Sequence, residues 1–332
     1  MISRNLTLFT ISHAVIDMVC MWAMFFIFAA NPYEGLKFAV IYNFFAFAFQ
    51  PLVGMFADTV KKPKEITLVG YVLTAAGIML FPKFNVAGAV IIGIANAMFH
   101  VGAGIIVYNL NPNTPKWQGV YISSGGVGLG LGALAAKAGL SNIYFFAALI
   151  VLFILTLFIK TPAAAYAVQR AKFNKNIFFG ILILVMTAIF IRSLSSFDIG
   201  VFVNGAVQKW YLILFVALGK AVGGFVYEKL GLLKGTVLPL ILAGVLFLLA
   251  EYSFYFAVMS AAIISMTTGV TLYFLFLLMP RRPGLAFGFN CLALFLGLMI
   301  FMLAGTMGTI VTISLLVILT LSVFISGGKL NG

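Results

Sequence analysis

The chain has 332 residues, of which 64% are hydrophobic and only 8% are charged. This composition excludes a single water-soluble domain and makes the lipid bilayer the expected solvent. The formal net charge of +13 would indicate nucleic acid only if the basic residues formed one face of a soluble element. The chain has no polar segment long enough to form such an element.

Twelve apolar segments have the length of about 17–25 residues that a helix needs to cross the hydrocarbon core. In chain order they are 6–30, 36–57, 66–82, 86–109, 117–137, 142–160, 177–200, 207–227, 233–250, 253–279, 284–304 and 307–326. The longest polar connection, 161–176, follows the sixth segment. The sequence therefore predicts an all-α integral membrane protein with twelve transmembrane helices in two pseudo-symmetric six-helix bundles, residues 1–160 and 177–332, joined by a cytoplasmic linker at 161–176.

The basic residues are distributed unevenly over the connections between these segments. If the N-terminus is inside, most of them fall on that side, and the exceptions are Lys37, Lys83, Lys137 and Lys209. This positive-inside pattern predicts that both termini are cytoplasmic. We therefore expect a multi-pass protein of a bacterial-type inner membrane, with the lipid bilayer and not nucleic acid as its partner.

Two short motifs close the second and the eighth segment and lie about half a chain apart. In the first, Asp58 follows Gly54, and in the second, Gly224 is followed by Glu228 and Lys229. Glycine lets two helices approach closely, and an acid near basic residues can pair across the ends of two helices. The motifs predict two similar halves with conformational gating at the cytoplasmic face. The alternative is that these residues are solvated loop charges.

At these motifs the chain resembles the major facilitator superfamily, whose members carry the pattern G-x3-(D/E)-(R/K)-x-G-(R/K) after the second helix and a weaker copy after the eighth. The stretches SHAVID, NAMFHVGAG, GVYISSGGVGLGLG and FIRSL are similar to transporters of the fosmidomycin-resistance type. Val101 and Ala133 stand where those transporters often have proline. The resemblance implies two bundles that rock about a central cavity, lined by the first and fourth helices among others.

Ionisable residues inside a membrane segment are costly and are therefore functional candidates. His13 and Asp17 are four residues apart and share one face of the first helix. A helix rises by about 1.5 Å per residue. Counted from the cytoplasmic ends of their segments, His100 in the fourth segment therefore lies at a depth in the membrane similar to that of His13 in the first. We expect the three side chains to converge at the cavity and to bind a coupling proton, since histidine titrates near neutral pH. The alternative is a hydrogen-bonded network that only fixes helix packing.

Arg192 lies within the seventh segment and needs a partner or a water-filled cavity there. By resemblance it faces an anionic substrate or a gate, and a guanidinium can bind a phosphate, phosphonate or carboxylate bidentately. Asp198 is expected near the outer surface. Further polar side chains are candidate substrate contacts or, alternatively, interhelical hydrogen bonds: Asn43, Asn96, Tyr108 and Asn290.

Other chemistry is disfavoured by the scarcity of suitable residues. The chain has only two histidines and seven carboxylates, too few and too scattered for a metal site or a hydrolytic pair, so we expect no metal, no cofactor and no enzyme activity. Cys20 and Cys291 show no metal-ligand or redox spacing. The glycines between positions 125 and 132 predict close helix packing, because no strand precedes them as a dinucleotide loop would require.

These features together predict a secondary active transporter that works by alternating access. The leading hypothesis is proton-coupled export of a small organic compound or drug, with an anionic compound indicated by Arg192, by a monomeric protein. An importer or an uncoupled facilitator would keep the same fold. A lipid or amphiphile flippase and a non-transporting sensor or scaffold stay open as alternatives.

Overall fold

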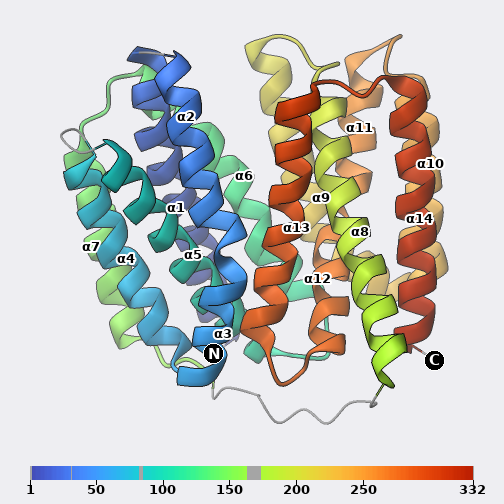
Figure 1. Cartoon of the computed structure of the whole chain (residues 1–332), viewed down its shortest axis with the longest axis horizontal. Helices are drawn as coiled ribbons and strands as arrows, with labels where there is room; N and C mark the ends of the chain where they lie inside the picture. Colours follow the sequence, from blue (N-terminus) through green and yellow to red (C-terminus); the bar gives the residue numbers. More distant parts are fainter. Residues whose placement is uncertain (1, 31, 82–84, 163–172, 332) are drawn as a thin grey trace. The chain divides into compact units, whose positions relative to one another are not determined.

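A computed structural model describes residues 2–30, 32–81, 85–162 and 173–331, which are helical apart from short connections (Figure 1). The first half contains α1 (Ile2–Ala30), α2 (Pro32–Asn43), the π-helical turn η1 (Phe44–Ala48), α3 (Gln50–Val60), α4 (Pro63–Leu80), α5 (Asn85–Leu110), α6 (Lys116–Lys137) and α7 (Asn142–Phe158). The second half contains α8 (Lys175–Gly200), α9 (Ala206–Leu232), the π-helical turn η2 (Leu233–Val237), α10 (Leu238–Leu248), α11 (Phe254–Ser265), α12 (Thr267–Leu278), α13 (Pro283–Ala304) and α14 (Thr309–Asn331). Most of the predicted linker, residues 163–172, lies outside the described residues.

Ten helical stretches of the described residues are long and apolar enough to cross a membrane, which makes the chain a multi-pass membrane protein. The twelve predicted segments coincide with helices, but two details differ from twelve simple spans. Segments eight and nine form one continuous stretch, Ala206–Leu248, with a kink at Gly231, where φ is 74°. The helix α7 has only 17 residues, at the lower limit of what crosses the hydrocarbon core.

Contacts between residues divide the chain into two compact units. Unit 1 comprises Met1–Leu110, Ser124–Ala164 and Pro283–Gly288, and unit 2 comprises Asn111–Ser123, Ala165–Arg282 and Phe289–Gly332. Each unit therefore holds most of one predicted bundle together with a short segment from the other half of the sequence. The domain limits 1–160 and 177–332 stay a prediction.

The interior of unit 1 is organised around α5, whose side chains are buried almost all round. Its close packing on α4 depends on glycine: a Cβ at Gly70 would lie 2.8 Å from the backbone nitrogen of Phe99, and one at Gly102 would lie 2.7 Å from the carbonyl oxygen of Pro63. In unit 2 the consecutive helices α11 and α12 are buried in the same way. Polar side chains on these helices therefore face protein rather than lipid.

Candidate functional site

The predicted convergence of two histidines on Asp17 is confirmed in unit 1. On α1, His13 Nε2 lies 3.3 Å from Asp17 Oδ2, and from α5, His100 Nε2 lies 3.5 Å from Asp17 Oδ1. The two imidazole rings meet edge to face, with centroids 4.5 Å apart. All three side chains are buried, so the carboxylate is flanked by a histidine on each oxygen in a setting of low dielectric.

Asn96, one turn before His100 on α5, fixes the orientation of this cluster. Its side-chain Nδ2 donates to Asp17 Oδ1 at 3.2 Å, and its carbonyl oxygen lies 2.8 Å from His100 Nδ1. Because a carbonyl can only accept, Nδ1 of His100 must carry a hydrogen. In the neutral ring Nε2 is then a lone pair that faces a carboxylate oxygen, so the contact with Asp17 becomes attractive only when a further proton is bound.

Gly125 on α6 gives the cluster its space. A Cβ at this position would lie 2.5 Å from Asp17 Oδ2 and 2.7 Å from His13 Nε2. One and two turns on, Gly128 and Gly132 lie so close to carbonyl oxygens of α1 that a side chain would overlap them, which confirms the predicted close packing. Sequence reasoning assigned the whole glycine run to packing and missed the separate role of Gly125.

The fold also gathers potential ligand atoms that are scattered along the sequence. One nitrogen or oxygen atom from each of His13, Asp17 and His100 lies within 4.8 Å of the others, a spacing that could hold a metal ion. The sequence-based reason for expecting no metal site, that such residues are too scattered, therefore does not apply to these three.

The predicted substrate contacts fall into both units. In unit 1, Asn43 Nδ2 donates to Ala39 O of its own helix at 2.7 Å, Asn96 belongs to the Asp17 cluster, and Tyr108 is buried. In unit 2, Asn290 is buried, and its Oδ1 has no hydrogen-bond partner among the described residues. Asn96 thus lies beside Asp17, and its role as a substrate contact stays a prediction.

Arg192 on α8 is a buried cation in unit 2, with 3% of its surface exposed. Its Nη1 donates to Thr271 Oγ1 on α12 at 2.7 Å, whereas Nη2 has no partner among the described residues. The hydroxyls of Ser195 and Thr268 on the same two helices are also buried without a partner in this part of the chain. A buried guanidinium that has one hydroxyl partner and a spare donor is suited to binding an anion.

Asp198, expected near the outer surface, lies two residues before the end of α8 and is buried in unit 2. Its carboxylate accepts a hydrogen bond from the backbone nitrogen of Met307 at 2.8 Å and another from the hydroxyl of Thr312. The acid therefore joins the end of α8 to the first turn of α14, where a negative charge is favourable. This contact depends on two distant segments and leaves no signal in the local sequence.

The first glycine–acid motif, Gly54 and Asp58, contacts the start of α13 within unit 1. Asp58 accepts hydrogen bonds from the backbone nitrogens of Gly284 at 2.8 Å and Leu285 at 2.9 Å. At Gly54 the helices approach so closely that a Cβ would overlap the carbonyl group of Gly284. The carboxylate thus caps a helix N-terminus, which is a favourable site for a negative charge.

The second motif makes a different contact within unit 2. Glu228 forms an ion pair with Lys116 Nζ at 2.6 Å and accepts a hydrogen bond from Thr114 Oγ1 at 3.1 Å. A Cβ at Gly224 would lie 2.8 Å from the Cα of Lys116. Lys229 is exposed and has no polar partner in the described ranges, so the motif's acid and glycine make the contact and its lysine does not.

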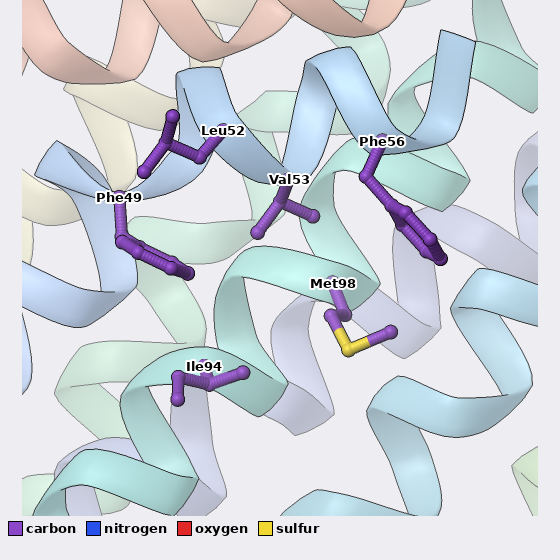
Figure 2. A pocket seen from close by; sticks show the side chains of 6 residues that line it. All are labelled: Phe49, Leu52, Val53, Phe56, Ile94 and Met98. Carbon is purple, nitrogen blue, oxygen red and sulfur yellow. The ribbon is translucent and has the colours of Figure 1, made fainter. Parts of the chain in front are cut away.

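A cavity of about 280 Å³ in unit 1 lies apart from these polar clusters. Figure 2 shows that its walls come from α3, the residue before it and α5, and it is lined by Phe49, Leu52, Val53, Phe56, Ile94 and Met98. All six side chains are apolar, so none of them can orient a charged substrate.

The comparisons with known proteins identify the fold. No family model and no curated protein matches the sequence. Among solved structures, the E. coli fucose:proton symporter FucP matches 96% of this chain and 99% of its own, at 11% identity and a TM-score of 0.64. The human organic anion transporter MFSD10 matches 98% and 99%, at 14% identity and a TM-score of 0.62. A major facilitator transporter, FucP, in the outward conformation matches 94% and 97%, at 12% identity and a TM-score of 0.62. At such identities the likeness establishes the fold alone, and the chain has the major facilitator fold.

Proposed function

We propose that the protein is a secondary active transporter that moves a small organic anion by alternating access and couples this movement to protons. The fold is shared with a fucose:proton symporter and an organic anion transporter, so both proton coupling and anion transport occur on it. The observation that carries the proposal is the buried Asp17 held between His13 and His100.

The proton-binding step follows from the hydrogen bonds of this cluster. With Nδ1 of His100 donating to Asn96 O, a proton between His100 Nε2 and Asp17 converts two facing acceptors into a hydrogen-bonded pair. His13 approaches the other carboxylate oxygen and offers a second position for the proton. Uptake and release of this proton is the event that we propose to be coupled to transport.

Arg192 supplies a complementary fixed charge. Arginine stays protonated in proteins, and its Nη2 has no partner among the described residues, so an anionic substrate group would complete its hydrogen bonds. Asn290, Asn43 and Tyr108 are proposed as further substrate contacts, and Asn96 as a contact that also orients Asp17. The contacts of Asp58 and Glu228 are proposed to stabilise one conformational state, with Gly54, Gly224 and Lys229 supporting them.

The likeness to the fosmidomycin-resistance type supports export as the direction of transport. The basic residues on one side support cytoplasmic termini in a bacterial-type inner membrane. A monomer suffices for this mechanism, because both clusters lie within one chain.

The test is a proton-flux assay in liposomes that contain the purified protein and a pH-sensitive dye. A panel of organic anions, cations, antibiotics and lysolipids is added under an imposed proton gradient. We expect one or more anions to move protons through the wild type, and this flux to disappear in Asp17→Asn. Glu34→Gln, which neutralises a half-buried acid on α2 that pairs only with the neighbouring Lys37 in the ion pairs of the described residues, is the matched control and should transport normally.

The other outcomes distinguish the alternatives. Anion uptake that Asp17→Asn leaves unchanged would replace coupling with facilitated transport. Movement of labelled lysolipid between leaflets would identify a flippase, and no transport of any compound would favour a sensor or scaffold.

A further inference from the structure

A second cavity, of about 560 Å³, lies in unit 1 where the beginning of α1 meets the end of α7. It is lined by Ser3, Arg4, Thr7, Leu8, Ile11, Leu155, Phe158 and Ile159. None of these residues belongs to the clusters described above. The amide of Asn5 donates to the carbonyl oxygen of Lys160 at 3.0 Å and ties the two walls together.

The lining changes from polar to apolar along α1. Ser3, Arg4 and Thr7 lie in the first two turns, and Leu8 and Ile11 follow deeper in the helix. From Arg4 to Ile11 the helix rises by about 10 Å. Opposite them, α7 presents Leu155 and Phe158, which are 50% and 79% exposed. The cavity therefore has a polar mouth at one end and an open apolar wall along its length.

The mouth of the cavity is electropositive. Arg4 is exposed, and none of the described lining residues is acidic. The C-terminal carbonyls of α7, which would otherwise repel an anion, accept hydrogen bonds from Lys64 Nζ: Leu157 O at 2.7 Å and Ile159 O at 2.9 Å. A phosphate beside Arg4 is thus attracted by the guanidinium and meets a helix end that is already neutralised.

We propose that this cavity binds an anionic phospholipid. The lipid phosphate binds Arg4 and the hydroxyls of Ser3 and Thr7, and an acyl chain lies along Leu8, Ile11 and the exposed face of α7. Basic pockets at the membrane face are sites for anionic lipid head groups. The cavity of Figure 2 lacks any polar lining residue. It therefore gives no reason to prefer an anionic lipid over a neutral one and serves as an internal comparison.

The test uses the purified full-length protein in liposomes with spin-labelled phosphatidylglycerol or phosphatidylcholine. Electron paramagnetic resonance measures the fraction of each lipid that the protein immobilises. We expect phosphatidylglycerol to be preferred, and Arg4→Gln to lower this preference about fivefold, the effect of about 1 kcal/mol that one basic residue exerts near an anionic lipid. Arg281→Gln, which removes an exposed arginine outside the cavity, should leave the preference unchanged.

A second pair of variants separates a cavity from general charge attraction. Ile11→Trp fills the apolar part and keeps Arg4, and we expect it to remove the preference as well. Leu52→Trp makes a similar change in the cavity of Figure 2 and should have no effect. The proposal is overturned if the wild type does not prefer phosphatidylglycerol, if Arg4→Gln behaves like Arg281→Gln, or if Ile11→Trp keeps the preference. Because Ile11 is 51% exposed, this variant tests the proposal even if Arg4→Gln does not fold.

Discussion

The two units bury charges of opposite sign and treat them differently. In unit 1 the carboxylate of Asp17 contacts two histidines and an asparagine. In unit 2 the guanidinium of Arg192 contacts one hydroxyl and has no ion-pair partner among the described residues. In the proposed function the first arrangement gains and loses a proton, whereas the second keeps a constant charge.

This difference separates two tasks that a coupled transporter must perform. A group that titrates is a poor anchor for an anion, because its charge changes during the cycle. A group that stays charged cannot carry the coupling proton. The comparison therefore predicts that substitutions in the Arg192 cluster of unit 2 impair transport of the anion itself. Substitutions in the Asp17 cluster of unit 1 should instead impair the coupling of anion transport to protons.

The largest effect is expected at Arg192. Arg192→Met removes the fixed charge and its spare donor, and anion-driven transport should fall about 100-fold, as expected for a hydrogen bond to a charged group. Initial rates of anion uptake in liposomes measure this. Arg192→Lys keeps the charge without the bidentate geometry, so anion-driven transport should fall less in this variant than in Arg192→Met. If Arg192→Met binds and moves the anion normally, unit 2 does not supply the anchor.

A smaller effect, confined to coupling, is expected at Gly125. In Gly125→Ala the new methyl group would overlap Asp17 and His13, and displacing one charged hydrogen bond should lower proton flux about tenfold. Anion exchange without a proton gradient should change little. Comparing the loss in the two assays therefore shows whether the variant impairs proton coupling separately from anion movement. The matched control is Gly126→Ala, because no atom lies within 4 Å of a Cβ there. Equal losses in both assays would contradict the division of tasks.

Two features of these sites can be read from the sequence: the helical spacing of residues and the depth of each residue in the membrane. The spacing of His13 and Asp17 gives a shared helix face, and counting residues from the membrane surface places His100 at the same depth; both expectations match the distances found. The apolar runs likewise locate the helices, because a membrane span needs a fixed length. Such reasoning works for residues whose positions depend on one helix at a time.

The rotation of each helix about its own axis, and its packing against other helices, cannot be predicted by such counting. Which hydroxyl meets Arg192 depends on how α8 and α12 are rotated toward each other, so Thr271 could not be predicted as its partner. The partners of Asp198 could not be predicted for the same reason, since Met307 and Thr312 lie on a distant segment. The bond from Asn96 to Asp17 could not be predicted either, because the sequence gives the depth of a residue in the membrane but not the direction of its side chain.

The two glycine–acid motifs, which contain Asp58 and Glu228, allow the smallest and most direct comparison. Asp58 binds two backbone nitrogens at the start of α13 and is half-buried, whereas the ion pair of Glu228 with Lys116 is partly exposed. Loss of a helix cap costs about 1 kcal/mol, and an exposed ion pair contributes about 0–1 kcal/mol. Asp58→Ala should therefore shift the balance between conformational states about fivefold, and Glu228→Ala should shift it less.

Distances between spin labels on exposed positions at the ends of α3 and α13, and of α6 and α9, measure this balance. Thr59→Ala, which removes a hydroxyl that only bonds its own helix at Met55 O, is the control for Asp58→Ala. An equal shift in both acid variants would mean that the motifs act as equivalent charges. A larger shift in Asp58→Ala would mean that a helix cap stabilises the conformational state more strongly than an exposed ion pair.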